Sequence, residues 1–194
     1  LHNFRKGKID ILVGTELLAH QVDLPSVSLI GILNPEAMLA LSDFRAGQRT
    51  FQALTRMMSF LEEDSLSEVI IQTALPRHFS ILKAARNDYV SFYNQEIKFR
   101  LLMNYPPFSH MAEVLLMGEN LRSLAQKARE FSAEVKSFGR DIEILGPALA
   151  PISKVRGLSR VQLVLKSRKK ERLDAFLRES LRKIRLRKSV IILG

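Results

Sequence analysis

The chain has 194 residues, of which 46% are hydrophobic and 26% charged, as in a globular protein with one large core or two small ones. No stretch approaches 18 consecutive apolar residues, and no charged segment followed by an apolar one opens the chain, so the sequence predicts neither a membrane span nor a signal peptide. The absence of cysteine excludes disulfides and thiolate metal ligands, and we expect a cytoplasmic protein. Because residues 1–8 have the pattern of a helix end and the first residue is Leu1, we expect a piece of a longer protein.

The formal net charge of +10 is distributed unevenly along the chain. Residues 1–74 hold 6 lysines and arginines against 9 carboxylates, whereas residues 75–194 hold 24 against 11. From Lys154 to the end the counts are 14 and 3. Such a field attracts polyanions, nucleic acid first among them. A solvated basic helix surface is the alternative interpretation.

Three short apolar runs in the first region are typical of buried parallel strands, and they lie at residues 9–14, 27–33 and 68–73. Between the second and third, the spacing of the apolar residues predicts a helix over residues 43–63 with Asp43 as its N-cap. This order favours half of a doubly wound α/β sheet.

Ligand contacts in such sheets are expected at the carboxyl ends of the strands, where Gly14 and Thr15 follow the first run. Free backbone N–H groups and a hydroxyl at a helix start suit a phosphate. A simple helix N-cap is the alternative interpretation of this pair.

The second region begins with a helical pattern over residues 78–103, which Tyr105-Pro106-Pro107-Phe108 ends. The pattern predicts a bracing helix and linker over residues 76–108, between a first domain at 1–75 and a C-terminal α/β domain at 109–194. In this last domain we expect strands at 110–117, 142–145, 159–166 and 189–193 and helices at 121–138 and 169–185. Their β-α-β-β-α-β order is that of the ferredoxin-like arrangement.

The ferredoxin-like arrangement serves many functions, among them RNA binding. The aromatic residues with which RNA-recognition sheets stack bases are missing, because Val161, Leu163 and Leu165 occupy the corresponding type of strand. An independent RNA-binding module is therefore kept as an alternative. In the loop at residues 153–160, Lys154, Arg156 and Arg160 are candidates for DNA phosphate contacts, with an ordinary solvated loop as the alternative.

Several segments carry a resemblance to a known family. They are Asp10-Ile11-Leu12-Val13-Gly14-Thr15, Asp23-Leu24-Pro25, Asp43-Phe44-Arg45-Ala46, Asn104-Tyr105-Pro106-Pro107-Phe108 and Ile144-Leu145-Gly146-Pro147-Ala148. In their order and spacing the segments resemble the PriA family of primosomal replication-restart helicases. The resemblance implies a partial RecA-like helicase lobe at residues 1–75, followed by the family's C-terminal domain.

The resemblance also implies a function and its cofactors. The parent would be a DNA-stimulated ATPase that unwinds DNA 3′ to 5′ and uses ATP and Mg²⁺. The phosphate-binding loop, the Mg²⁺ motif and the zinc-binding cysteines of the family would lie upstream, so this chain alone would bind no cofactor and hydrolyse no ATP. Gly14 and Thr15 would touch the tracking strand, and Asp23 would lie near the nucleotide.

The partners implied are forked or single-stranded DNA, the acidic tail of single-stranded DNA-binding protein, and other primosome proteins. Lys169, Lys170 and Arg172 are the candidates for capturing the acidic tail, with a solvated helix start as the alternative. No membrane partner is expected. The four histidines lie far apart without carboxylates at ligand spacing, so no metal site is predicted in this chain.

The chain departs from the family at its arginine motif. Phe60 and Glu63 stand where the family has arginines, which stabilise charge on a transferred phosphoryl group. Arg45 and Arg49 are the nearest replacements, although a place on the helix surface is the other interpretation of both. Either the parent is an inactive scaffold that binds DNA and proteins, or another residue supplies the cation. We favour impaired ATPase activity.

Overall fold

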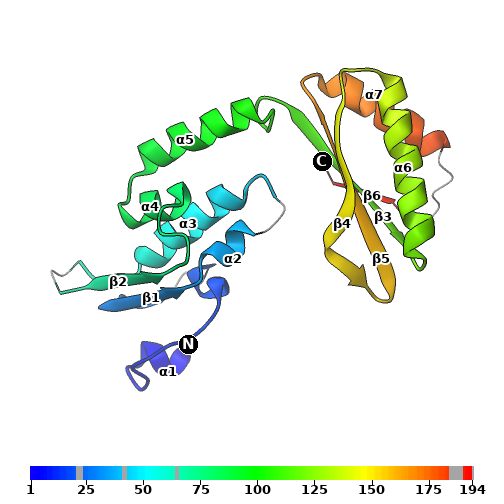
Figure 1. Cartoon of the computed structure of the whole chain (residues 1–194). Helices are drawn as coiled ribbons and strands as arrows, with labels where there is room; N and C mark the ends of the chain where they lie inside the picture. The colour runs from blue at the N-terminus through cyan, green and yellow to red at the C-terminus, as the bar shows by residue number, and fades with distance from the viewer. Residues whose placement is uncertain (21–23, 41–42, 64–65, 184–189, 194) are drawn as a thin grey trace. The chain divides into compact units, whose positions relative to one another are not determined.

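The structure is a computed structural model, and it describes residues 1–20, 24–40, 43–63, 66–183 and 190–193. The chain divides into two compact units, Leu1–Ile97 and Lys98–Gly194. This division lies inside the 76–108 segment that we expected to connect two domains. Both units are mixed α/β, which confirms the coarse fold class (Figure 1).

The first unit contains two strands, five α-helices and a 3₁₀ helix among its described residues. In chain order these are α1 (His2–Arg5), η1 (Glu16–His20), β1 (Leu29–Leu33), α2 (Glu36–Leu39), α3 (Ala46–Met58), β2 (Glu68–Gln72), α4 (Phe79–Ala85) and the greater part of α5 (Tyr89–Leu102). β1 and β2 pair in parallel, from Leu29 opposite Glu68 to Leu33 opposite Gln72. The strands predicted at residues 27–33 and 68–73 are thereby confirmed.

The strand predicted at residues 9–14 is wrong. These residues form no regular element, and Ile11 and Val13 are 78% and 87% exposed. A strand is stable only when its backbone groups pair with a neighbour, and this segment pairs with no strand in the described part of the chain. Although these residues are apolar, Ile11 and Val13 are therefore not buried in the core of this unit.

The helix α3 begins at Ala46 and ends at Met58, within the predicted 43–63 range. Asp43 is not its N-cap, because Arg45 holds that position and the Asp43 Oδ1 accepts the Arg45 N–H at 2.9 Å. Phe51 and Leu54 on this helix pack against Ile32 of β1 and Phe92 of α5. The rings of Phe51 and Phe92 stack with their centroids 4.0 Å apart, which places the core of this unit between α3 and α5.

The single long helix predicted at residues 78–103 is broken into α4 and α5. Asn87 has a φ of 50°, a left-handed conformation that interrupts a helix and that asparagine tolerates better than most residues. The Asp88 Oδ1 then accepts the Ser91 N–H at 3.0 Å, at the start of α5. The second helix thus starts with its own cap instead of continuing the first.

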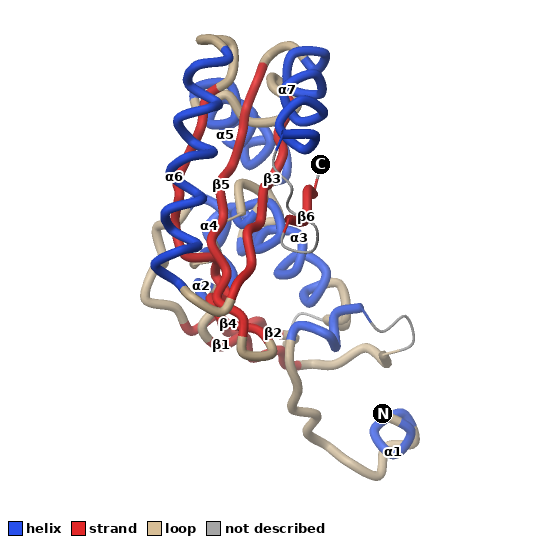
Figure 2. The backbone as a smooth tube through the Cα atoms, turned by 90° about the vertical axis from the view of Figure 1, so that its right-hand side faces the viewer, coloured by secondary structure: helices blue, strands red, loops and turns tan. Residues whose placement is uncertain are grey.

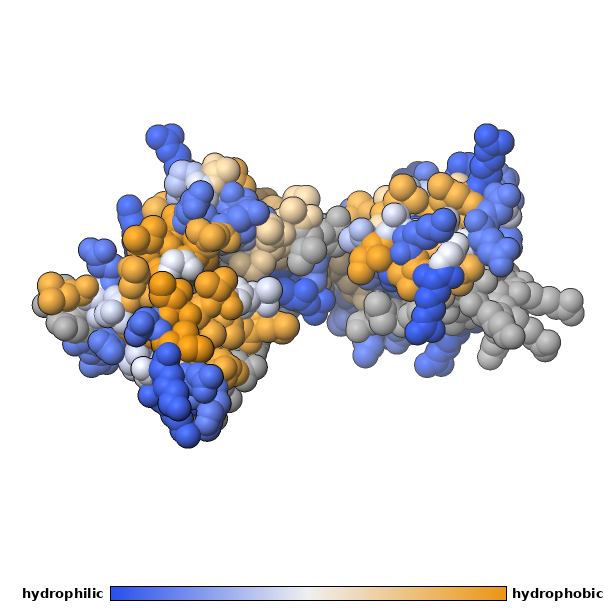
Figure 3. All heavy atoms as spheres, turned by 90° about the horizontal axis from the view of Figure 1, so that it is seen from below, coloured by the Kyte–Doolittle hydropathy of each residue, from blue (hydrophilic) through white to orange (hydrophobic). Residues whose placement is uncertain are grey.

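The face of the two-stranded sheet that points away from the core is apolar and exposed to solvent. Leu29 and Leu33 of β1 and Ile70 of β2 are exposed, whereas Ile32 and its neighbours face the core. In Figure 3 apolar side chains gather on one face of this unit.

The second unit is a four-stranded sheet with two helices. After the end of α5 its elements are β3 (His110–Gly118), α6 (Leu121–Phe138), β4 (Glu143–Val155), β5 (Leu158–Ser167), α7 (Lys170–Lys183) and β6 (Val190–Leu193). The spatial order is β4-β5-β3-β6, and every neighbouring pair is antiparallel. The predicted helices and strands of this unit are therefore present, with shifted ends at several of them.

Both helices lie along one face of this sheet (Figure 2). Alternate residues of the central strands turn towards them, including Val114 on β3 and Leu163 on β5, and pack against Phe131 of α6 and Phe176 of α7. The Asn120 Oδ1 accepts the Ser123 N–H at 3.0 Å and caps α6. This core fixes β5 and α7, which carry Arg160, Lys166, Lys170 and Arg172.

The edge strand β4 is much longer than the predicted 142–145 segment. Its pairing with β5 is irregular at two places, between Leu145 and Ala148 and between Leu149 and Lys154. Gly146, at the first irregularity, has a φ of 97°. β4 and β5 join at Arg156 and Gly157, whose φ angles of 48° and 83° are both positive, as in the tight two-residue turns of hairpins.

Candidate nucleic-acid interface

The carboxyl ends of β1 and β2 meet at a small polar network around Glu36. Its carboxylate accepts the Thr73 hydroxyl at 2.8 Å and the Ala74 N–H at 2.7 Å. The bond from Ala74 is the main reason that the pKa of Glu36 lies below its ordinary value. Glu36 therefore holds the start of α2 against the end of β2, and it shapes the edge at which ligand contact was expected.

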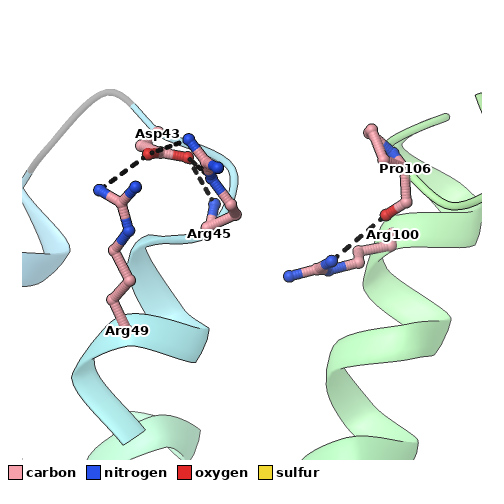
Figure 4. Close-up of polar contacts among 5 residues, drawn as sticks. All are labelled: Asp43, Arg45, Arg49, Arg100 and Pro106. Carbon is pink, nitrogen blue, oxygen red and sulfur yellow. Dashed lines mark hydrogen bonds and ion pairs between the residues drawn. The ribbon is translucent and has the colours of Figure 1, made fainter. Parts of the chain in front are cut away.

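Asp43, Arg45 and Arg49 form an ion cluster ahead of and along α3 (Figure 4). The Asp43 carboxylate contacts the Arg45 Nε at 3.1 Å and the Arg49 Nη1 at 3.0 Å. Burial opposes ionisation of Asp43, but the hydrogen bonds and charge of Arg45, with the charge of Arg49, outweigh it, so its pKa is lowered. Both arginines that we considered as replacement cations are thus already engaged with a carboxylate.

In this chain the segment expected to carry the arginine motif forms backbone hydrogen bonds with Val27. The Val27 N–H donates to the Phe60 carbonyl at 2.9 Å, and the Glu62 N–H donates to the Val27 carbonyl at 3.0 Å. Residues 60–62 therefore run beside Val27, two residues before β1, and Leu61 forms an isolated parallel bridge with Val27. Glu62 and Glu63 are exposed, and no arginine stands between Arg56 and this bridge.

Gly14 and Thr15 precede the five-residue helix η1, and both are exposed. The Thr15 carbonyl accepts the Leu18 N–H at 2.9 Å, and the Leu18 side chain lies over Gly14. The expected role of these two residues on a DNA strand stays a prediction. Asp23, the candidate near the nucleotide, lies outside the described residues.

The three predicted phosphate contacts of the second unit gather at the turn of the β4–β5 hairpin. Lys154 and Arg156 are exposed, and Arg160 is half-buried. The Arg160 Nη1 donates to the Ile152 carbonyl at 3.3 Å, whereas its Nε is buried without a hydrogen-bond partner. The structure shows a tight turn where the sequence suggested an open loop, so the two exposed charges are held in place by strand pairing.

A second basic group surrounds a recess of about 360 Å³ beside the start of α7. Its lining includes Arg140, Lys166, Arg168 and Lys169, together with the carboxylates of Asp141 and Glu143. Of the three predicted partner-binding residues, Arg172 is engaged, with Asp141 at 3.4 Å and the Phe138 ring at 5.2 Å. Lys169 and Lys170 are exposed, which leaves their charges towards solvent.

Sequence reasoning missed Lys166, which is only 4% exposed. Its Nζ donates to the Met103 carbonyl at 2.9 Å, contacts the Glu143 Oε1 at 3.0 Å and lies 4.9 Å from the Tyr105 ring centre. Arg168 likewise donates to the Asn104 Oδ1 at 2.8 Å. These bonds tie the turn after α5 to β5, and the Arg100 Nη1 adds a bond to the Pro106 carbonyl at 3.3 Å (Figure 4).

Within the described ranges, no cluster of three or more histidine or carboxylate side chains is placed to hold a metal ion. Among the same residues, no helix has the length and apolar character that crossing a membrane requires.

Comparison with known proteins bears on the origin of these features. The family described as "Primosomal protein N C-terminal domain" matches residues 102–192. Replication restart protein PriA of Bacillus subtilis is 36% identical over 183 residues, which is 93% of this chain and 23% of that protein. PriA of Borreliella burgdorferi is 31% identical over 196 residues, which is 99% of this chain and 29% of its own length. The chain belongs to the PriA family.

The chain spans about a quarter of the length of the PriA relatives it matches. The family-matched residues, 102–192, lie within the second unit and begin at the last residue of α5. Among solved structures, a designed protein named Foldit4 aligns with 44% of this chain and 91% of its own at a TM-score of 0.36 and 17% identity. That likeness is too slight to carry an argument about fold or function.

Proposed function

We propose that this chain is the C-terminal part of a replication-restart helicase and that it contacts forked or single-stranded DNA. The observation that carries the proposal is the hairpin turn, where Lys154, Arg156 and Arg160 gather in a unit that belongs to the PriA family. Phosphate contacts from such side chains give affinity without sequence preference. The chain would act in the cytoplasm.

The proposal extends to the architecture of the two units. The first is the end of a RecA-like lobe, which the parallel pairing of β1 and β2 and the intervening α3 support. The second is ferredoxin-like, which its element order and its β4-β5-β3-β6 sheet support. In this view Gly14 and Thr15 lie on the tracking strand and Asp23 near the nucleotide.

We infer that the parent is an ATP-dependent 3′–5′ DNA helicase with impaired ATPase activity. ATP, Mg²⁺ and zinc would be bound by upstream parts of the parent. Two observations support the impairment: residues 57–63 contain no arginine, and Arg45 and Arg49 both contact Asp43. A transition-state arginine contributes on the order of 10³ to 10⁵ in rate, so its loss would leave little turnover.

Partner binding completes the proposal. Lys169 and Lys170, with Arg172 beside them, would receive the acidic tail of single-stranded DNA-binding protein. Their exposure and the basic recess next to them support this assignment. Other primosome proteins would be further partners of the parent.

The deciding experiment measures steady-state ATPase activity of the full-length parent with and without forked DNA. A restored variant would carry Ser59→Gly, Phe60→Arg, Glu62→Gly and Glu63→Arg, and its control would carry only Glu62→Gln and Glu63→Gln. We expect no DNA-stimulated turnover in the parent and a gain only in the restored variant. DNA-stimulated turnover in the unmodified parent would contradict the impairment and direct the search to another cation.

A second function, a catalytically inactive scaffold, is favoured by the bridge that residues 60–62 form with Val27. If the parent is such a scaffold, the restored variant would show no ATP turnover, while both proteins would still bind forked DNA. Retained salt-dependent fork binding without ATPase activity in either protein would establish the scaffold.

A further inference from the structure

The β4–β5 hairpin exposes apolar side chains close to its basic ones. Leu149 is 57% and Ile152 64% exposed, and Val155 at the turn is exposed as well. An edge strand on a solvated surface ordinarily carries polar side chains at such positions. Exposed apolar side chains that are grouped on one element and surrounded by polar ones mark a contact surface.

The backbone holds these apolar side chains in place. Between the Leu149–Val161 and Lys154–Ser159 pairs, β4 advances by five residues while β5 advances by two. Such a bulge turns side chains away from the regular ladder. Ala150 inside it is buried, and the Arg160 guanidinium bonds the Ile152 carbonyl, so the bulge is anchored on both sides of Pro151.

The positive charge around the bulge favours a negatively charged partner. Residues 144–165, which form the hairpin on both sides of the bulge, contain no carboxylate and three basic residues, Lys154, Arg156 and Arg160. Seen from the end that carries the hairpin turn, the surface of this unit shows apolar and hydrophilic side chains interspersed (Figure 3). A partner for this surface must offer negative charge and apolar faces together, and a nucleic acid whose bases are unpaired does so.

We propose that the bulge of β4 reads the junction between single- and double-stranded DNA through Leu149 and Ile152. This inference rests on the proposed binding of forked DNA and adds the two residues that would distinguish a fork from a continuous duplex. In a continuous duplex each base is covered by its neighbours, and only phosphates and groove edges meet the protein. At a junction the last base pair and the first unpaired base expose their faces, against which an aliphatic side chain can be buried.

The two kinds of side chain therefore have separable effects. Lys154 and Arg156 contact phosphates, which duplex, fork and single strand all present. Leu149 and Ile152 contribute only where a base face is open. Removing the charges weakens binding to every probe, whereas removing the apolar groups lowers only the preference for the fork.

The test measures binding of the 194-residue chain to three labelled probes by fluorescence anisotropy at several salt concentrations. The probes are a forked DNA, a blunt duplex and a single strand of matched sequence. The apolar variant carries Leu149→Ser and Ile152→Ser, and the basic variant carries Lys154→Gln and Arg156→Gln. Leu145→Ser is the matched control, because Leu145 is also an exposed leucine of β4 but pairs opposite Val164, away from the turn.

We expect the apolar variant to lose about fivefold or more of its affinity for the fork, since two aliphatic side chains stay in water. Its affinity for the duplex and its salt dependence should equal those of the unsubstituted chain. The basic variant should weaken on all three probes and show a shallower salt dependence. Leu145→Ser should change nothing.

The serine substitutions could lower fork affinity merely by disturbing the hairpin, and Ile152→Phe controls for this. Because phenylalanine offers a larger apolar surface, this variant should keep or raise the preference for the fork. The inference is overturned if the apolar variant binds the fork like the unsubstituted chain, if it weakens equally on all probes, or if Ile152→Phe abolishes the preference. Binding of the unsubstituted chain to all probes without fork preference would overturn the inference and leave the proposed function standing. No binding to any probe would overturn both.

Discussion

At the scale of single residues, Lys166 shows how the second unit accommodates a nearly buried charge. A buried ammonium needs hydrogen-bond acceptors and a counter-charge, and the Met103 carbonyl and the Glu143 carboxylate provide them. Because Met103 follows α5, this one side chain fixes the turn after that helix to the sheet. Its role is structural, and it also forms one wall of the basic recess.

Lys166→Met should lower the free energy of unfolding of the second unit by about 1 to 3 kcal/mol, since the Met103 carbonyl loses its partner. Lys169→Met, at an exposed neighbour, should stay within about 0.5 kcal/mol of the unsubstituted chain. Urea denaturation followed by circular dichroism measures both. Equal losses in the two variants would contradict a specific role for Lys166.

Asp88 allows a prediction for the dependence of stability on pH. Hydrogen bonds from Ser91, and then from Lys83, lower the pKa of Asp88 to about 2 from an ordinary 3.8. The stabilisation is therefore complete above about pH 4 and is lost as the pH falls towards 2. Asp88→Asn can still cap α5 but cannot titrate, so the difference in unfolding free energy between the two proteins should shrink over that range. A difference that stays constant from pH 5 to pH 2.5 would contradict the prediction.

At the scale of elements, the hairpin depends on two glycines for different reasons. Gly146 has a φ of 97°, and a Cβ there would lie 2.9 Å from the Gln162 carbonyl oxygen. Gly157 has a φ of 83° with open space around it. The first position demands both a rare conformation and close backbone approach, whereas the second demands only the conformation.

Gly157→Ala should therefore cost about 1 kcal/mol of unfolding free energy, the cost of the left-handed conformation. Gly146→Ala should cost more, about 2 to 3 kcal/mol, because the neighbouring strand must also move. Gly118→Ala, without positive φ and with only ordinary contact to Leu124, is the control and should be nearly neutral. Thermal and urea denaturation rank the three, and a reversed order of the first two would contradict the argument.

At the scale of the whole molecule, the uneven charge governs how the chain responds to salt. If three basic residues of the hairpin contact phosphates, the logarithm of the association constant for a duplex should fall with the logarithm of salt concentration at a slope of roughly −3. Anisotropy between 50 and 200 mM salt, a range in which this effect is usually large, measures it. Lys169→Gln with Lys170→Gln should leave the slope unchanged, and a slope near zero would exclude phosphate contacts as the source of affinity.

The sequence predicted the second unit better than the first because its elements are long and strongly patterned. The helix expected at 121–138 is α6 itself, with its apolar stripe on the core. The run at 9–14 has the same apolar character as a buried strand, but a strand also needs a neighbour, which local pattern does not reveal. The long helix at 78–103 was wrong because a single asparagine in a left-handed conformation divides it.

The candidate interface was predicted in part for a related reason. Lys154, Arg156 and Arg160 are close in sequence and so were expected together, and they lie on β4, in the turn and on β5 of one hairpin. Their contact with DNA stays a prediction. The full length of β4, and with it the exposure of Leu149 and Ile152, was missed because Gly146, Pro147 and Pro151 suggested that the strand ends at residue 145. On an edge strand such residues are tolerated as bulges, and only the pairing with β5 shows this. Lys166 was missed because its burial depends on Met103, 63 residues away.

The irregular backbone of β4 also determines which chains this sheet can recruit. A straight outer strand offers a continuous row of N–H and C=O groups to which an extended peptide adds as one more strand. Two interruptions within β4 leave only short regular stretches on that side. The protein is thus protected along this side from strand-by-strand association with other copies of itself, and whatever binds there must do so through side chains.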